Sequence, residues 1–354
     1  MTDPMTPTDD PNEDILKEYG DADGELSDQD NVALIGEAYA KMREQISKMI
    51  IGQDEVVENL LTCIFAGGHC LLVGVPGLAK TLLVTTLSEV LDLDFKRIQF
   101  TPDLMPSDIT GTDIIQDDPV TRERVYKFMP GPIFSNIILA DEINRTPPKT
   151  QAALLEAMQE KQVSIGSKVY QLERPFFVIA TQNPIDQEGT YPLPEAQQDR
   201  FLFNIFVDYP EFDDEMDIVQ TVTSGAAETV NAVVSAEEIL RFRDLIRRTP
   251  VAKHVLQYAV TLVRATRNEK PESPDFVKDW VSFGAGPRAG LALISAAKAR
   301  AILQGNFHAS VEDVMAVAKP VLRHRIAPNF AAQAEGVTSD TIIEKLLETI
   351  PRFE

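Results

Sequence analysis

Apolar residues recur at three- and four-residue spacing from about position 31, which predicts an amphipathic helix. Its apolar positions are Val32, Ile35, Ala38, Tyr39, Met42, Ile46 and Met49. A second helix is expected beyond Gly52, where Val56, Val57, Leu60 and Leu61 are apolar.

Five short apolar runs of β character follow, each ending in polar or glycine residues. They are Cys70 to Val73, Phe95 to Phe100, Ile137 to Ala140, Phe176 to Ala180 and Phe201 to Val207. Helical stretches fall between some of them, notably Lys80 to Val90 and Gln151 to Glu160. This alternation favours an α/β fold with a mostly parallel sheet that is covered on both faces. Ligands of such sheets bind at the carboxyl ends of the strands.

Two segments depart from the alternation and predict hairpins. Leu104 to Pro132 contains Gly111, an Asp-Asp-Pro turn and alternating residues, and Gln162 to Glu173 has Gly166 and Ser167 at its centre. From about Phe212 the strand signals stop and helical periodicity dominates. We therefore expect a core domain over residues 31–211 and a smaller helical domain over residues 212–354.

The charge of the chain is concentrated at its start. The 354 residues include 55 acidic and 33 basic ones, which gives a net charge of −22. Residues 1–30 hold eleven of the acids and a single base, for a net charge of −10. Because they have almost no aromatic content, they cannot bury enough apolar surface to offset chain entropy, and we expect a disordered acidic tail. The net charge of −12 on the remaining residues argues against a protein that binds duplex nucleic acid through a broad basic face.

Cysteine and histidine usage points away from disulfides and metal centres. The two cysteines, Cys63 and Cys70, indicate a reducing compartment, and the four histidines lack the spacing of metal ligands. Since the chain also shows neither a leader segment nor a membrane-spanning run, we expect a cytoplasmic protein.

A phosphate-binding loop is the clearest chemical motif. The run after the first strand is Gly74-Val75-Pro76-Gly77-Leu78-Ala79-Lys80-Thr81. It matches G-x-x-x-x-G-K-[ST] except that Ala79 replaces the second glycine, which is tolerable if Ala79 already lies at the start of the helix. Backbone N–H groups and the helix dipole would cradle phosphates, Lys80 would reach the β and γ oxygens, and Thr81 would ligate Mg²⁺. The alternative is a glycine-rich turn with a chance Lys-Thr.

The third apolar run ends in two carboxylates, Asp141 and Glu142. Downstream of a phosphate loop, this is the form of a Walker B motif. Asp141 would help to hold Mg²⁺, and Glu142 would orient and deprotonate the attacking water. Taken alone, a strand that ends in Asp-Glu indicates only a solvated terminus.

Together these motifs resemble an AAA+ ATPase. The narrower runs Gly-Val-Pro-Gly-Leu-Ala-Lys-Thr, Ala-Asp-Glu-Ile-Asn-Arg, Ala-Thr-Gln-Asn-Pro and Tyr-Pro-Leu-Pro-Glu-Ala-Gln-Gln-Asp-Arg-Phe resemble the MoxR family. The resemblance covers Asn31 to the C-terminus. It implies a three-layer αβα core with a parallel five-stranded sheet, two hairpin insertions and a smaller all-α lid domain.

The resemblance also implies roles for three later residues. Asn183 would be sensor 1, placed to hydrogen-bond the γ-phosphate or the lytic water; the alternative is a turn former before Pro184. Arg200 would be an arginine finger that reaches the nucleotide of a neighbouring subunit; the alternative is a surface arginine paired with Asp199. Arg288, in the first turn of an alanine-rich helix, would be sensor 2; the alternative is a solvated arginine at a helix start.

Three further features are assigned by resemblance with alternatives open. Gln53 belongs to a segment that packs beside the adenine base. Gln99, at the end of the second strand, either couples partner binding to Glu142 or is an ordinary polar strand end. The two hairpins would be insertions, one interrupting the helix after the second strand and one before sensor 1; they either face the pore or the client, or are exposed decorations.

By resemblance, the protein is expected to hydrolyse Mg-ATP in a homo-oligomeric ring, with a hexamer as the expected size. The ring would act as a chaperone-like motor that matures a client enzyme, often by metal or cofactor insertion, with a partner that bears a von Willebrand factor A domain. The rivals are a magnesium-chelatase-type ATPase subunit and an ATP-gated scaffold with little hydrolysis. A nucleic-acid motor is disfavoured by the charge.

Overall fold

The computed structural model describes residues 28–117, 124–166, 168–185, 189–224 and 228–352. The expected acidic tail lies outside these residues, apart from positions 28–30, which form the first turn of α2 (Asp28–Ser47). Within the described residues, no helix has the length and apolar character needed to cross a membrane.

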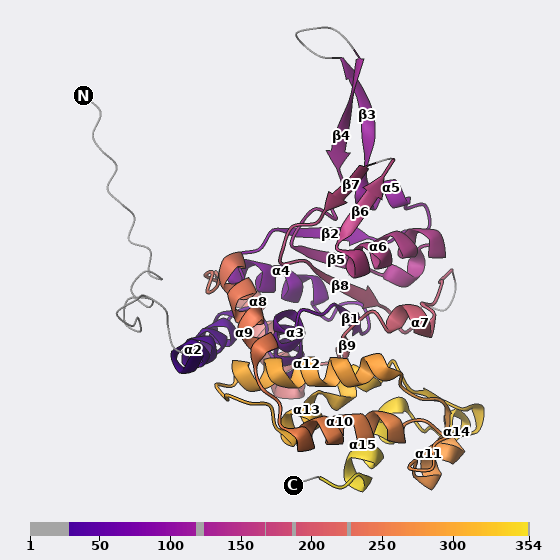
Figure 1. The fold of residues 1–354 in the computed structure, drawn as a ribbon. Helices are drawn as coiled ribbons and strands as arrows, with labels where there is room; N and C mark the ends of the chain where they lie inside the picture. Colours follow the sequence, from indigo (N-terminus) through magenta and orange to yellow (C-terminus); the bar gives the residue numbers. More distant parts are fainter. Residues whose placement is uncertain (1–27, 118–123, 167, 186–188, 225–227, 353–354) are drawn as a thin grey trace.

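A five-stranded parallel sheet forms the centre of the core (Figure 1). Its strands are β1 (Cys70–Val73), β2 (Phe95–Gln99), β5 (Ile137–Asp141), β8 (Phe177–Gln182) and β9 (Phe203–Phe206). Their order is β2-β5-β8-β1-β9. All five predicted strands are confirmed; β1 has the predicted ends, and the ends of the other four differ by at most two residues. The register pairs Gln99 with Asp141, which sets two polar strand ends side by side.

Successive strand residues point to opposite faces, and each face has its own apolar core. On β5, Ile137 and Leu139 belong to a core shared with α3 (Asp54–Phe65), α4 (Lys80–Val90) and the C-terminal helices. Ile138 and Ala140 belong to a second core with α6 (Pro148–Glu160). The expected three-layer arrangement is therefore confirmed.

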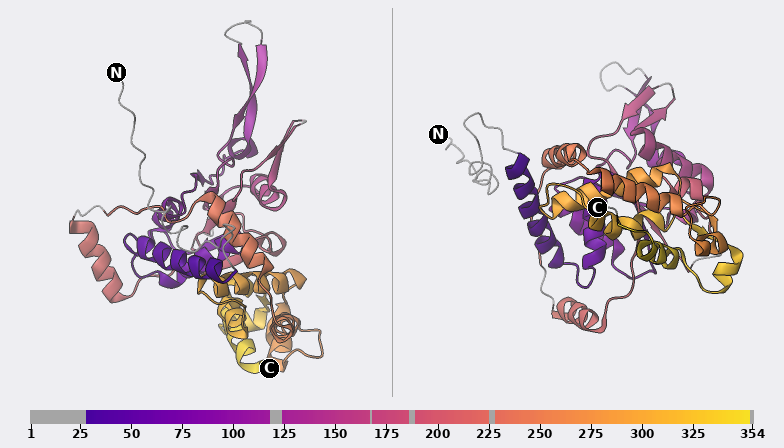
Figure 2. Two further views of the ribbon diagram at one scale, coloured as in Figure 1. Left: turned by 60° about the vertical axis from the view of Figure 1, so that its left-hand side comes forward. Right: turned by 60° about the horizontal axis from the view of Figure 1, so that its bottom comes forward.

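Two antiparallel hairpins project from the same end of the core (Figures 1 and 2). The longer joins β3 (Gly111–Asp117) to β4 (Arg124–Pro130), and the shorter joins β6 (Gln162–Ile165) to β7 (Lys168–Gln171). The short helix α5 (Pro106–Thr110) precedes the longer hairpin, and β5 follows it without a second helical piece. The hairpin thus ends this helix rather than interrupting it.

The C-terminal region is predominantly helical, as expected. Its helices are α9 (Ala236–Arg248), α10 (Lys253–Ala265), α11 (Asp275–Trp280), α12 (Pro287–Leu303), α13 (Val311–Leu322), α14 (Phe330–Ala334) and α15 (Ser339–Thr349). One short antiparallel pair, β10 (Val281–Phe283) with β11 (Ala327–Pro328), also lies here, so this region is not entirely α. The two strands are too short to leave a period-2 pattern. Between β9 and α9 lies α8 (Phe212–Ser224).

Candidate functional site

The loop between β1 and α4 has the backbone that a phosphate loop requires. Gly77 adopts a φ of 89°, which favours glycine, and no described residue other than its two chain neighbours has an atom within 4 Å of where its Cβ would be. Ala79 lies directly before α4, with φ 52° and ψ 21°. Its Cβ is thus accommodated in left-handed geometry rather than in the first helical turn, at a cost of about 1–2 kcal/mol.

Lys80 lies over this loop. Its Nζ donates to the carbonyl oxygens of Gly74 and Val75, both at 2.7 Å. Burial lowers the pKa of Lys80, while the negative charges of Asp141 and Glu142 act to raise it. Thr81, the next residue, is exposed. The ammonium group is held at the loop by carbonyls that phosphate oxygens could replace.

A cavity of about 360 Å³ brings the loop together with the strand ends of β5 and β8. It is lined by Pro76, Gly77, Leu78, Ala79, Lys80, Thr81, Asp141, Glu142, Thr181 and Asn183. Residues from the phosphate loop and from two strand ends therefore meet at one place, at the carboxyl edge of the sheet where ligands bind. Thr181 was not singled out by the sequence.

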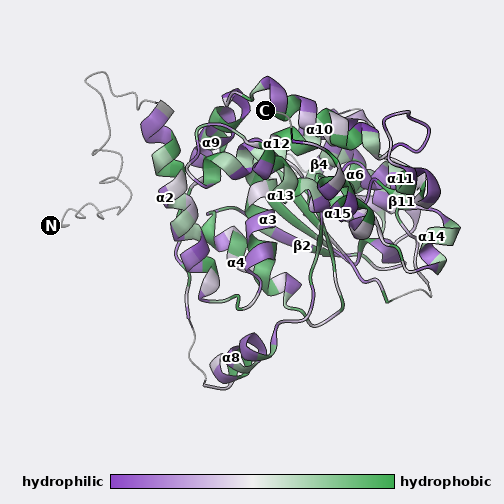
Figure 3. Ribbon diagram, turned by 90° about the horizontal axis from the view of Figure 1, so that it is seen from below, coloured by the Kyte–Doolittle hydropathy of each residue, from purple (hydrophilic) through white to green (hydrophobic). Residues whose placement is uncertain are grey.

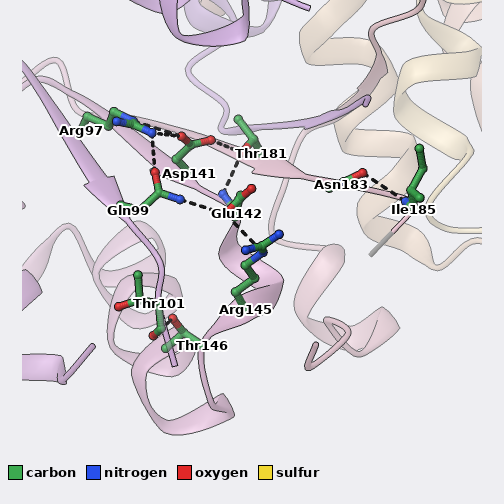
Figure 4. A network of polar contacts seen from close by, with 10 residues as sticks. All are labelled: Arg97, Gln99, Thr101, Asp141, Glu142, Arg145, Thr146, Thr181, Asn183 and Ile185. Carbon is green, nitrogen blue, oxygen red and sulfur yellow. Dashed lines mark hydrogen bonds and ion pairs between the residues drawn. The ribbon is translucent and has the colours of Figure 1, made fainter. Parts of the chain in front are cut away.

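Asp141 is held by two neighbours that the motif does not reveal (Figure 4). Oγ1 of Thr181 donates to Asp141 Oδ1 at 2.6 Å. Arg97 donates from Nε and Nη2 to Asp141 Oδ2 at 3.0 and 2.6 Å. Arg97 lies two residues before Gln99 on β2, hence on the same face, but only the register of β2 on β5 identifies it as a neighbour of Asp141.

Glu142 is fixed through both its backbone and its side chain. The residue has φ 56° and ψ 49°, and its N–H donates to Thr181 Oγ1 at 2.8 Å. Its Oε2 accepts from Gln99 Nε2 at 2.9 Å and forms an ion pair with Arg145 Nε at 3.2 Å. Gln99 therefore contacts Glu142, which the interpretation of Gln99 as a residue coupled to Glu142 requires.

Asn183 serves as a turn former and also faces the cavity. Its Oδ1 accepts from the backbone N–H of Ile185 at 3.1 Å, and the residue is 7% exposed. Both readings from the sequence thus have a structural counterpart.

Gln53 reaches the phosphate loop from the start of α3. Its Nε2 donates to the carbonyl oxygen of Leu78 at 3.4 Å. Its Oε1 is buried and has no hydrogen-bond partner among the described residues. An orphaned acceptor beside a phosphate loop fits a ligand that brings a donor.

Arg200 and Arg288 do not line this cavity. Arg200 Nε donates to Gln159 Oε1 on α6 at 3.2 Å, and Arg288 forms an ion pair with Asp199 at 3.5 Å. Asp199 is also paired with the buried Arg325 at 2.8 Å. The expected pairing of Asp199 with an arginine is therefore made to residues of the C-terminal region and not to Arg200.

Comparisons with known proteins show which chains this one is similar to. Residues 69–203 fit the model of the ATPase family associated with various cellular activities, and residues 276–346 fit that of an AAA lid domain. Chaperone MoxR1 of Mycobacterium tuberculosis is 44% identical over 86% of this chain and 80% of its own. Protein MoxR of Methylorubrum extorquens is 30% identical over 89% and 95%. A crystal structure from Cytophaga hutchinsonii, described as a candidate ATPase, superposes with a TM-score of 0.85 at 41% identity, covering 92% of this chain and 97% of that one.

Proposed function

Because this chain belongs to the MoxR family of AAA ATPases, which hydrolyse ATP, we propose that its hydrolysis drives a ring of identical subunits that remodels a client protein. The observation that carries the proposal is the joint placement of Lys80, Asp141, Glu142 and Asn183 around one cavity. A similar relative is named a chaperone, in keeping with a remodelling role.

The phosphate loop would bind the nucleotide through groups that are already in place. The Lys80 ammonium would exchange its two carbonyl partners for the β and γ oxygens of ATP. The residues from Gly74 to Thr81 supply the N–H groups around the phosphates. Gln53 Oε1, buried and unpaired, would accept a hydrogen bond from the base.

The site also offers hard oxygen ligands of the kind that Mg²⁺ prefers. The Thr81 hydroxyl and the Asp141 carboxylate line the same cavity, so both could hold the ion, Asp141 directly or through a water. When bound, Mg²⁺ would neutralise charge that develops on the β and γ phosphates. Arg97 and Thr181 hydrogen-bond the Asp141 carboxylate and would fix its orientation for this role.

Glu142 is the proposed general base, since its carboxylate lines the cavity beside the expected γ-phosphate. Gln99 and Arg145 hold that carboxylate, so their contacts would have to loosen when the water is deprotonated. Asn183 would orient the same water or bind the γ-phosphate.

Arg200 is proposed to act in trans. Arg200 lies outside the cavity of its own subunit and donates to Gln159 rather than to a carboxylate. Its guanidinium would therefore be free to contact the nucleotide of a neighbouring subunit. Such a finger raises phosphoryl-transfer rates by roughly 10³ to 10⁵. Arg288, tied to Asp199 beside Arg200, would report nucleotide occupancy to the lid. The hexamer is the proposed ring size.

The two hairpins are proposed to contact the client or a partner with a von Willebrand factor A domain. They leave the same end of the core (Figure 1), and the rings of Phe128 and Tyr170 stack at 4.3 Å between them. Exposed apolar side chains lie on both, such as Tyr126 and Val169. This combination supports one client-facing unit, whose action on a client enzyme would include metal or cofactor insertion.

The test is the variant Glu142→Gln. It should bind ATP and hydrolyse it at under about a hundredth of the wild-type rate, and in ATP it should retain the client in a pull-down. The matched control is Glu156→Gln, an exposed position on α6, which should turn over normally. Wild-type turnover by Glu142→Gln would refute the general base, and negligible turnover by the wild type would indicate an ATP-gated scaffold.

A further inference from the structure

The helix α8 exposes an apolar face that nothing in the described chain covers. Phe212, Met216, Val219 and Val222 recur at helical spacing, and their exposed fractions are 75%, 59%, 57% and 74%. None of the thirteen residues of α8 is buried. Figure 2 shows the helix standing apart from the rest of the molecule. An amphipathic helix normally buries such a face.

The face of α8 opposite the apolar one lies toward the rest of the subunit. Its partly covered residues are Asp214, Ile218 and Thr221. The Asp214 side chain lies against the backbone of Gly52, so close that a Cβ there would be 2.6 Å from its Oδ2. Gly52 precedes Gln53, which hydrogen-bonds the phosphate loop. The helix therefore lies on the side of the subunit that holds the phosphate loop, and its apolar face points outward into solvent there.

The outward face has acidic flanks. Phe212 to Ser224 contains Asp213, Asp214, Glu215 and Asp217 and no lysine or arginine. A surface that covers it must offer apolar contact and positive charge, which excludes an anionic membrane and favours a basic protein surface.

This chain itself carries such a surface, at the junction of α9 and α10. Arg247, Arg248 and Lys253 are exposed there. On the outer side of α10, Leu256 is 42% exposed and Val260 is 53% exposed, one helical turn apart. Of these residues, Arg247 also forms an ion pair with Asp244 at 3.3 Å on its own helix.

The two surfaces lie on opposite sides of the subunit. Figure 3 shows α8 on one side, with α9 and α10 on the other. One subunit cannot bring them together, but adjacent copies can. A contact between two different surfaces of identical subunits is heterologous, and it builds a closed ring when the rotation between subunits closes.

We propose that the apolar face of α8 packs on the α9–α10 surface of the next copy. This inference rests on the proposed ring, and it names a contact that holds the ring together. Because α8 lies beside Gly52, the contact places a neighbouring subunit at the nucleotide side, where an arginine from that neighbour is needed.

Met216→Asp combined with Val219→Asp tests the apolar part. Sedimentation velocity with adenylyl imidodiphosphate and Mg²⁺ measures assembly. The concentration for half-assembly should rise roughly tenfold or more, since central interface residues carry most of the binding energy. Phe330→Asp is the control, because Phe330 is 88% exposed on α14 and belongs to neither surface. This control should assemble like the wild type.

Charge reversal tests the identity of the contact. Asp213→Lys with Asp217→Lys should weaken assembly, and so should Arg248→Glu with Lys253→Glu. All four changes in one chain should restore it, because every interface of the ring then pairs reversed charges. Failure of this rescue would overturn the α9–α10 contact.

The outcomes separate this inference from the proposed function. A wild-type protein that stays monomeric with nucleotide refutes the ring itself. A wild type that assembles beside an α8 variant that assembles equally well refutes only the contact. If the α8 variant assembles normally but binds nucleotide more weakly, the apolar face of α8 covers the nucleotide cavity of its own subunit. The proposed contact with the next copy is then wrong. Circular dichroism of each variant verifies folding.

Discussion

The amide of Gln99 donates from Nε2 to Oε2 of Glu142 at 2.9 Å, joining the end of β2 to the end of β5. The bond restrains the carboxylate that is proposed to activate water. Gln99 is also contacted by Arg97, so the strand end forms one polar unit with Asp141. Release of this bond is therefore expected to change turnover more than nucleotide binding.

Gln99→Ala should raise basal kcat by roughly fivefold with little change in KM, since one hydrogen bond of this kind is worth about 1 kcal/mol. Steady-state ATP hydrolysis measures both constants. Gln171→Ala, at an exposed position of the shorter hairpin, is the control. An unchanged kcat would show that Gln99 is an ordinary polar strand end.

Thr181→Val should impair both stability and turnover. Thr181 is 1% exposed, and its hydroxyl donates to Asp141 and accepts from the N–H of Glu142. Valine has the same shape and neither capacity, so unfolding should become easier by about 1–3 kcal/mol, and turnover should fall. Thr181→Ser retains the hydroxyl and should recover most of both. Equal losses in the serine and valine variants would speak against the hydroxyl.

Arg200→Ala and Glu142→Gln should each be inactive alone and active when mixed. In a mixed ring, an Arg200→Ala subunit keeps an intact cavity, and its Glu142→Gln neighbour supplies an intact arginine. The restored turnover should follow the mixing ratio and peak at an intermediate one. No recovery in assembled mixed rings would mean that Arg200 acts within its own subunit.

His69 should make the protein less stable in mild acid. Burial lowers the pKa of His69 to about 4, although a hydrogen bond to the carbonyl of Met158 acts to raise it. The unfolded chain has the ordinary value of about 6.5, so it binds the proton first. The contribution of neutral His69 to stability is thus present above about pH 6.5 and is lost as the pH falls toward 4. Between pH 7 and pH 5 the loss should be about 2 kcal/mol.

The measurement is urea unfolding at both pH values for the wild type and for His69→Gln. Glutamine does not titrate, so the variant should show a shallower pH dependence whatever its absolute stability. Equal slopes for the two proteins would contradict the assignment to His69. The exposed carboxylates contribute equally to both slopes.

Local patterns of the sequence were enough to predict the strands, α4 and the phosphate loop. Each of these depends on residues that are close together in the chain. Arg97 and Thr181 could not be found in this way, because their contacts with Asp141 arise from strand order and register. Their signal, a polar side chain near the end of a strand, is common to many residues without a role.

The C-terminal region shows a second limit. Helical periodicity predicted its helices, but β10 and β11 pair over too few residues to leave a pattern. Helical periodicity was expected from about Phe212, where α8 begins, yet periodicity cannot distinguish a buried apolar face from an exposed one. Only the packed chain separates the two cases.

Each central strand of the sheet packs against both apolar cores, one on either face. On β5, alternate side chains pack into the core that faces the lid and into the core formed with α6 and the base of the hairpins. A movement of the lid and a movement of the hairpins would therefore act on the same strand from opposite faces. β5 ends at Asp141 and Glu142 follows it directly, so a movement of either core would reach both carboxylates through this one strand.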